Sequence, residues 1–389
     1  MLTFNSFTGI NNVVPSHRLP DGDMIEAADV DIGLTGDISR RSGFTEISAH
    51  CHKNLWQASG FLLATCGAAL TAIWPDGTRY TVHPAVGPGR TWFCNLPDGR
   101  TTYTNGLIHG VTDGQVSSER SVPAPWSLGV PDEAFGALHS GQYRYHLTYV
   151  RLADRVEGPA ISSAPIAILQ GGLHLDGLPL ADGFEINVYL SGMDGEGGYL
   201  AGTTTGKEFD YTGNNAALVL PCRTLDALPF PVGTITAYWR GRVLVAQGSV
   251  LWASRASAPH LSDWRDFKPF DAAITMVQPV DDGIYVGTAK DLIFLSGATW
   301  DQLAYVPMQL GAVVLGSGVP APGDRIKLGA GTGSGSAMLC IAGGEIVAGF
   351  NGGQAVSLTS GRYRSTATEV CATFREIDGG IPQYLAAQQ

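Results

Sequence analysis

Three groups of residues have types and spacing that could support chemistry, and the first is the Gly-rich run GAGTGSGS at 329–336. A phosphate-binding loop requires Gly-Lys and then Ser or Thr at the start of a helix, and a dinucleotide-binding loop also leads into a helix. The flanking sequences here, RIKL and AMLCIA, are typical of strands. We therefore predict that this run is the flexible loop of a β-hairpin.

The second group is an acidic run near the N-terminus, made up of Asp21, Asp23, Glu26, Asp29 and Asp31. Carboxylates at alternating positions can converge on one calcium ion. The EF-hand order fails, however, because Gly33 stands at the third ligand position after Asp29 and Asp31. We predict a solvated acidic loop, with calcium binding as the alternative.

The third group is the nine histidines, of which His50 and His52 lie two residues apart. On a strand they share one face, but no third ligand follows nearby, so the spacing does not predict zinc. His139 and His146 fall where a linker meets the first strand of a second domain. We expect both to be structural or exposed.

The six cysteines do not form a C-x-x-C pair and lie singly among apolar residues. They are Cys51, Cys66, Cys94, Cys222, Cys340 and Cys371. Because structural zinc needs paired Cys or His ligands, we expect no metal site and read the cysteines as small buried side chains in a reducing compartment.

Other catalytic patterns are also missing. A G-x-S-x-G nucleophile elbow requires a helix after the turn, and no long amphipathic helix is evident in the sequence. Glycosidase chemistry needs two carboxylates across a pocket, whereas most Asp and Glu residues here fall at turn corners. We predict that the chain is not an enzyme and has no catalytic, cofactor-binding or metal-binding residues.

The composition indicates many short strands joined by tight turns. Hydrophobic residues make up 44% of the 389 residues and charged residues only 15%, and there are 51 glycines and 22 prolines. Gly supplies positive φ angles and Pro presets φ at turn corners. The net charge of −11 argues against a surface that grips nucleic acid, although an acidic or neutral wall would let DNA pass without sticking.

The N-terminal sequence MLTFNSFTGINN has neither a basic segment nor an apolar segment of the kind a signal peptide requires. No apolar run reaches the roughly 20 residues that span a bilayer. We therefore expect synthesis and folding in a cytoplasm, with no membrane-spanning segment.

The pattern along the chain predicts an all-β fold in four parts. Residues 1–48 form an N-terminal segment with assembly contacts and a hairpin at Gly36-Asp37, and 49–125 form a meander of short strands. The Pro-rich stretch 121–135 reads as a linker, and 136–222 as a small inserted β-sandwich similar to fibronectin type III. The meander returns over 223–389. Repeated small meanders predict a β-propeller of about four to seven blades.

A conspicuous aromatic tail follows the hairpin at 241–253, with Trp264 and Phe267 among polar residues after Pro259. In a propeller the chain must cross from the outer strand of one blade to the inner strand of the next. An aromatic side chain in that crossing can cover apolar edges. We predict that the tail is a packing plug and not a ligand platform.

Three segments together resemble one known family. They are FTGINNVVPSHRLPDGDMIEAADVDIGLTGDISRRSGFTEI at 7–47, RGRVLVAQGSVLWASRASAPHLSDW at 240–264, and GGIPQYLA at 379–386. They are similar to segments of the tail nozzle, or tail-hub stabilisation, proteins of short-tailed phages. Asp29-Val30-Asp31 stands where Asn-Val-Asp is usual, and Arg41-Ser42-Gly43 corresponds to an Arg-Gly element.

The resemblance implies a structural virion protein, because members of that family are β-propellers, often with inserted β-sandwiches, that assemble as a ring below the portal. We therefore expect a homo-oligomeric ring, by resemblance a hexamer, located in the virion tail after assembly in the host cytoplasm. Its expected partners are a head-to-tail adaptor or portal protein and other tail proteins such as a fibre or needle. Genomic DNA would be retained and ejected through the ring without sequence-specific binding.

Two alternatives remain open from the sequence. The first is a carbohydrate-binding or receptor-binding tail protein, whose Trp and Tyr side chains on blade loops would stack on sugars. The second is a tube or tip protein of a long-tailed phage, which the sequence does not separate from a nozzle.

Overall fold

A computed structural model describes residues 7–33, 35–41, 43, 45–46, 49, 51–328, 331–377 and 381–388. The described chain is all-β. Its helical elements are five 3₁₀ turns of three residues each: η1 (Ser16–Arg18), η2 (Asn215–Ala217), η3 (Trp300–Gln302), η4 (Gly323–Arg325) and η5 (Asn351–Gly353). None of the described helices is long and apolar enough to cross a bilayer.

Five four-stranded antiparallel sheets, here called blades 1 to 5, follow one another along the chain. Blade 1 comprises β5 (His52–Gln57), β6 (Leu62–Cys66), β7 (Ala69–Ile73) and β8 (Arg79–His83). Blade 2 comprises β9 (Trp92–Asn95), β10 (Thr101–Thr104), β11 (His109–Thr112) and β12 (Ser117–Glu119). Blade 3 comprises β23 (Thr236–Trp239), β24 (Arg242–Gln247), β25 (Val250–Ala253) and β27 (Phe267–Pro269). Each blade is an up-and-down meander, as in a β-propeller.

The last two blades and a terminal hairpin continue the series. Blade 4 comprises β28 (Ile274–Val280), β29 (Gly283–Thr288), β30 (Leu292–Ser296) and β31 (Ala304–Pro307). Blade 5 comprises β32 (Val319–Pro322), β35 (Ser336–Ala342), β36 (Glu345–Phe350) and β37 (Ala355–Ser357), with the short hairpin β33 (Lys327–Leu328) and β34 (Gly331–Thr332) between its first two strands. The terminal hairpin is β38 (Val370–Ile377) paired with β39 (Ile381–Gln388), and it forms a sheet of two strands only.

Asp76-Gly77 and Asp98-Gly99 lie in turns between blade strands, and an Asp-Gly pair between apolar runs is a hairpin signal in the sequence. Gly77 and Gly99 have φ values of +86°, in the left-handed region that favours glycine. The carboxylates of Asp76 and Asp98 accept hydrogen bonds from the backbone N–H two residues later, at 2.9 and 3.1 Å. These local bonds set the turn without tertiary help, which is why the sequence predicts them.

Adjacent blades pack face to face through shared apolar clusters. Phe93 of blade 2 joins Leu63 of blade 1, and Val243 of blade 3 joins Val111 of blade 2. Tyr285 of blade 4 packs with residues of blade 5. The clusters thus form one series of sheet-to-sheet contacts, in chain order, from blade 1 to the terminal hairpin.

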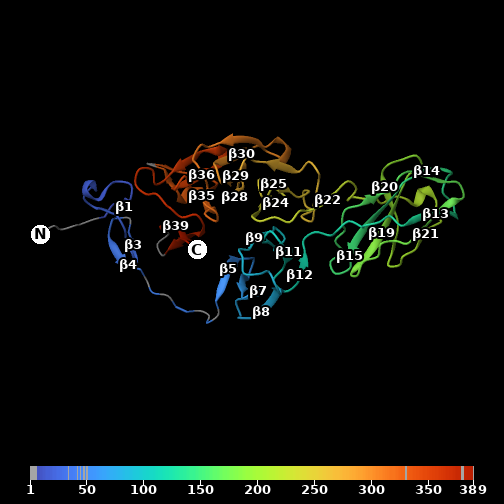
Figure 1. Ribbon diagram of the computed structural model, residues 1–389, viewed down its shortest axis with the longest axis horizontal. Helices are drawn as coiled ribbons and strands as arrows, with labels where there is room; N and C mark the ends of the chain where they lie inside the picture. The colour runs from blue at the N-terminus through green and yellow to red at the C-terminus, as the bar shows by residue number, and fades with distance from the viewer. Residues whose placement is uncertain are drawn as a thin grey trace.

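A separate domain is inserted between blades 2 and 3, and it lies to one side of the blades (green in Figure 1). Its strands are β13 (Val130–Phe135), β14 (Gly141–Tyr143), β15 (Tyr145–Arg151), β16 (Ile161–Ser162), β17 (Ile166–Ile168), β18 (Gly171–Asp176), β19 (Phe184–Ser191), β20 (Gly198–Thr204) and β21 (Phe209–Tyr211). They form a four-stranded sheet β16-β15-β19-β20, a three-stranded sheet β13-β18-β21 and the pair β14-β17. Leu147, Val188 and Leu173 from the two larger sheets share one core.

The structure corrects the predicted linker at 121–135. Its second half is strand β13, which pairs with β18 along its whole length. The prolines at 123 and 125 do break the blade, but Pro131 lies inside a strand at the edge of its sheet, where a missing N–H is tolerated. The inserted domain therefore starts before residue 136.

In the N-terminal segment β1 (Gly9–Ile10) and β2 (Asp23–Met24) pair in parallel, and Asp23 bonds Arg362 in the connection after blade 5. The segment continues into the hairpin β3 (Val30–Ile32) and β4 (Ile38–Arg40). In Figure 1 this segment (blue) lies on the opposite side of the blades from the inserted domain. A further short pair, β22 (Leu228–Pro229) with β26 (Leu261–Ser262), lies at the start of blade 3.

Candidate functional site: a channel between the blades

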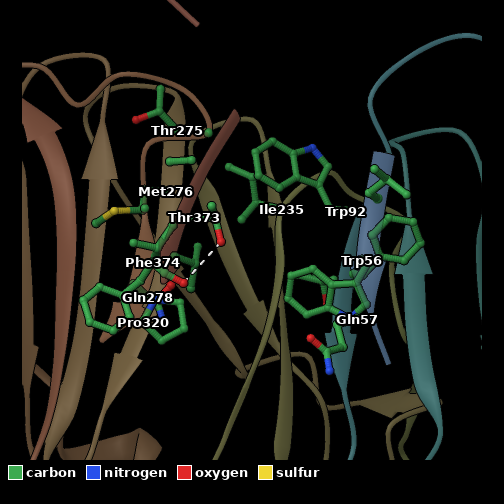
Figure 2. Close-up of a pocket in the computed structure, with 18 residues that line it drawn as sticks. Trp56, Gln57, Trp92, Ile235, Thr275, Met276, Gln278, Pro320, Thr373 and Phe374 are labelled. Carbon is green, nitrogen blue, oxygen red and sulfur yellow. Dashed lines mark hydrogen bonds between the residues drawn. The ribbon is translucent and has the colours of Figure 1, made fainter. Parts of the chain in front are cut away.

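The first strand of every blade, together with β38, lines one central cavity of about 380 Å³. Trp56 comes from β5, Trp92 from β9, Gln278 from β28, Pro320 from β32 and Phe374 from β38. Figure 2 shows side chains from these separate strands pointing toward the same space. The inner strands thus converge on an axis, which is the arrangement of a propeller channel.

None of the 18 residues that line this channel carries a charge. Aromatic side chains form one wall: Trp56 stacks on Phe93 with ring centroids 6.0 Å apart and donates from Nε1 to the side-chain oxygen of Asn95 at 2.8 Å. Leu55 in the same wall is 65% exposed. An uncharged, partly apolar lining offers little to a phosphate backbone, which binds proteins mainly through Lys and Arg.

The channel continues into a wider opening of about 680 Å³ at the seam between blade 1 and the terminal hairpin. Arg90 crosses this seam. Its Nη1 donates to the carboxylate of Glu369 at 3.1 Å and to the Val370 carbonyl at 2.9 Å, and its guanidinium lies 4.3 Å from the centre of the Trp92 ring. Polar contacts thus join the two sides of this seam, whereas apolar clusters join the other neighbouring blades.

The central cavity lacks a catalytic arrangement among the described residues; His52 and Cys371 line only the opening at the seam. Its hydroxyl groups belong to Thr236, Thr275 and Thr373, and no histidine or carboxylate lines the cavity beside them. Thr373 donates instead to the Phe374 carbonyl at 3.4 Å (Figure 2). Without a base in reach, these hydroxyls are not activated nucleophiles.

The predicted Gly-rich loop, acidic run and histidine pair do not meet in one place. Residues 329 and 330 lie outside the described part. The flanking Lys327 does lie in a hairpin, but its partner Thr332 is inside the Gly-rich run, and the predicted second strand AMLCIA lies in β35, which pairs with β32 and β36 instead. Asp23 accepts hydrogen bonds from Thr8, Asn11 and Arg362. In the part of the chain that the structure describes, no three His, Cys, Asp or Glu side chains are placed to share a metal ion.

The histidines and cysteines divide between surface and interior. His50 lies outside the described residues; His139 is exposed and His146 is buried. The prediction that the cysteines are buried is right for Cys94 and Cys340, whose thiol pKa values burial raises to about 12. It is wrong for Cys51 and Cys371, which are exposed; Cys51 directly precedes β5, and Cys371 in β38 lines the opening at the seam.

The predicted aromatic plug is also wrong for Trp264. Its side chain is 60% exposed, and the Arg265 guanidinium lies 4.4 Å from the centre of its ring. Phe267 is 42% exposed and contacts the Trp252 ring at 5.3 Å. The crossing after β25 packs through Leu261, which is 3% exposed, so the tryptophan is left on the surface.

No sequence pattern indicated a buried polar cluster at the junction of blades 2 and 3. Arg120 is 2% exposed; its Nη1 donates to Thr102 and its Nη2 to His109 Nδ1, both at 3.1 Å. Arginine only donates, so Nδ1 accepts and Nε2 carries the proton, which it donates to Ser121 at 2.8 Å. The guanidinium also lies 4.6 Å from the Phe230 ring centre.

This junction holds His109 in its neutral form. Burial, with Arg120 beside it, lowers the pKa of His109 to about 3, and burial lowers the pKa of Arg120 to about 9. The Glu119 carboxylate lies 3.9 Å from Nε2, but its side chain is 67% exposed and solvent screens it. The cluster therefore contributes to structure, since it is buried and neither residue lines the channel; the Arg120 Nε is the one buried nitrogen of this pair without a hydrogen-bond partner among the described residues.

A second network lies in the inserted domain. Glu157 Oε1 accepts hydrogen bonds from Thr148 at 2.5 Å, Tyr189 at 2.6 Å and Asn187 at 3.1 Å. Burial, followed by the bond to Glu157, raises the pKa of Tyr189. The backbone carbonyl of Glu157 bonds His260 Nε2 at 3.0 Å, which ties the domain to blade 3.

No family model matches this chain, and no curated protein matches it. Solved structures that it resembles include the Dos1 propeller, with a TM-score of 0.34 and 8% identity over 92% of this chain and 81% of that one. The Neurospora crassa Pan2 WD40 domain gives a TM-score of 0.33 and 9% identity over 88% and 92%.

A third similar structure is the extracellular domain of the putative hybrid two component system BT3049 from B. thetaiotaomicron. Its TM-score is 0.33 and its identity 9%, over 88% of this chain and 39% of that one. The propeller arrangement of the blades follows from their own strand order and packing.

Proposed function

We propose that this chain is a structural virion protein of a phage tail that forms a cyclic ring, or nozzle, below the portal or adaptor. The observation that carries the proposal is the joint resemblance of segments 7–47 and 240–264 to tail nozzle proteins. The uncharged channel and the lack of a catalytic arrangement around it are consistent with a mechanical role.

The genome path in such a ring lies between copies and not through one set of blades. The channel of one chain holds about 380 Å³, which is the volume of a small-molecule pocket. A DNA duplex is too wide for such a space, since its major groove alone measures about 12 Å across. Heterologous contacts between identical copies close into a ring when the rotation is cyclic, and by resemblance we propose six copies. A net charge of −11 per chain disfavours binding of the ring to the DNA that passes through it.

The inserted domain serves in this proposal as a peripheral contact module. Its four-stranded and three-stranded sheets around one core are consistent with the predicted fibronectin III-like sandwich. It projects away from the blades in Figure 1, where it is free to contact an adaptor, fibre or needle protein.

Electron cryomicroscopy of the virion tests the proposal. We expect density for a ring of this chain on the tail axis, and peptides of the chain in gradient-purified particles. A chain that stays monomeric and is absent from purified particles contradicts the proposal.

A receptor-binding role is a second candidate, which the 60% exposure of Trp264 favours. An exposed indole beside a guanidinium is a surface on which a sugar ring stacks. Under this candidate, Trp264→Ala removes binding on a glycan array. Trp126→Ala is the matched control, because Trp126 is similarly exposed, at 68%, but contacts Tyr149 of the inserted domain. Equal binding by both variants and the unaltered chain rejects a site at Trp264.

A further inference from the structure

The terminal hairpin is an incomplete blade. Blades 1 to 5 each have four strands, whereas β38 and β39 form a sheet of two. Strand β38 lines the channel like the first strand of every blade, and it packs on blade 5 through Phe374. The hairpin therefore occupies a sixth blade position, and its third and fourth strands are missing from that sheet.

The missing strands leave an open edge on β39. Within the described residues, β39 pairs with β38 alone, so one row of its backbone N–H and C=O groups has no strand beside it. An unpaired edge of eight residues is a template for strand addition. Pro382 limits pairing only at the turn end, which leaves Gln383–Gln388 available.

The N-terminal hairpin β3–β4 has two antiparallel strands, which is what the sixth blade lacks. Its two antiparallel strands pair only with each other, and Ile38 is 39% exposed. An isolated two-stranded hairpin is marginally stable in water, so it gains by joining a larger sheet. Its strands are three residues long, as are the outermost strands β12, β27 and β37.

The chain connection also fits. In the order β38-β39-β3-β4, strand β4 is outermost, and the chain then leads to β5, the inner strand of blade 1. The segment between them, 41–51, has eleven residues. Other connections from an outer to an inner strand have four residues at 270–273, eight at 84–91, eleven at 308–318 and twelve at 358–369. All of these join neighbouring blades of one chain, so the length shows that β3–β4 fits the sixth blade position, and the choice between copies rests on the contacts of the N-terminal segment.

Within one chain both partners are present, yet they do not pair. The segment before the hairpin is held on its own chain, where Asn12 bonds the backbone of Arg362 and Arg364, and Asp23 bonds the Arg362 side chain. After the hairpin, every described residue of the connection is exposed, namely Arg41, Gly43, Thr45, Glu46, Ala49 and Cys51. Among the described residues the hairpin thus forms no strand pair with its own β39.

We propose that β3–β4 of one copy pairs with the free edge of β39 in a second copy and completes its sixth blade. This inference rests on the ring of the proposed function and identifies the contact between neighbours. The contact is heterologous, because each copy donates one hairpin and accepts another, and repetition closes a ring. An eleven-residue connection spans at most about 40 Å, which limits how far apart the joined blades lie.

Photo-cross-linking of the full chain tests the exchange. A benzophenone amino acid is placed at position 38, and copies labelled with ¹⁴N and ¹⁵N are mixed unfolded, refolded together and irradiated. We expect peptides that contain position 38 to join peptides from 381–388, with about half of the pairs combining light and heavy chains. The same group at position 107, a turn residue that is 85% exposed, is the control and gives no link to 381–388.

Pairs of like isotope only would overturn the exchange, because the hairpin would then lie on its own β39. Links that miss 381–388 altogether would overturn it as well. In a second variant, Gly and Ser of equal length replace 30–40, and we expect sedimentation to show smaller assemblies; unchanged assemblies would contradict the proposal. If the virion contains a ring of this chain but the links join like isotopes only, the exchange is wrong and the proposed function stands. If the links join mixed isotopes but the protein is absent from virions, the proposed function is wrong and the exchange stands.

Discussion

At the scale of single residues, the features that matter most are buried polar groups whose partners come from distant segments. His109 is 4% exposed and accepts a hydrogen bond from Arg120, so the folded chain keeps it neutral. An unfolded histidine binds a proton near pH 6.5, whereas this one binds it near pH 3. The unfolded state therefore binds more protons between these values, and acid favours unfolding.

The first prediction follows from His109. As pH falls from 6.5 toward 3, its contribution to the free energy of unfolding is lost at up to about 1.4 kcal/mol per pH unit. The His109→Gln variant lacks this pH dependence. The difference in free energy of unfolding between the unaltered chain and the variant is therefore smaller at pH 5 than at pH 7. Urea unfolding at both pH values measures it.

The exposed His139→Gln is the matched control and leaves the slope unchanged. His146 and His260, whose pKa values burial also lowers, add the same slope to both chains and cancel in the comparison. A variant at His109 with the full acid sensitivity of the unaltered chain would show that this residue is not the cause.

At the scale of elements, close packing between neighbouring blades decides which side chains are allowed. Gly349 in β36 faces the Tyr285 ring of blade 4, and the Tyr285 hydroxyl donates to the Phe350 carbonyl at 2.6 Å. A Cβ atom at position 349 would lie 2.7 Å from the tyrosine ring and 2.6 Å from the Met338 methyl group. These contacts are shorter than van der Waals separation, so the sheets would have to move apart.

The second prediction is that Gly349→Ala destabilises the blades by about 1–3 kcal/mol through overpacking. Thermal unfolding followed by circular dichroism measures the loss. Gly89→Ala is the control, because nothing lies within 4 Å of a Cβ at that exposed turn position. Equal melting temperatures for the two variants would mean that the joint between blades 4 and 5 is looser than these distances indicate.

At the scale of the whole molecule, the blades and the inserted domain have separate cores. The core of the inserted domain is built from its own strands, with Val122 of the entering chain added. Polar contacts such as His260 to the Glu157 carbonyl, and Arg151 to the Glu119 carbonyl at 2.7 Å, join the two parts. Two units with distinct cores unfold separately when the contacts between them are few.

The third prediction is that calorimetry shows two transitions, and that Glu157→Ala lowers only one. The variant leaves Thr148 and Tyr189, which are 0% and 4% exposed, without their shared acceptor, at a cost of about 1–3 kcal/mol. Glu196→Ala, at an exposed position of the same domain, is the control. A single transition that shifts as a whole would show that the two parts fold as one unit.

The sequence alone determined the all-β class, the Asp-Gly turns and the hairpin at Gly36-Asp37, because alternation of apolar residues and left-handed glycines act over a few neighbouring positions. The tertiary structure decided that the first strands converge on an uncharged channel and that Trp264 stays exposed. It also decided that Arg120 and His109 are buried together and that the terminal hairpin lacks two strands. Each of these depends on segments tens to hundreds of residues apart, and pairing across such distances leaves no local pattern to read.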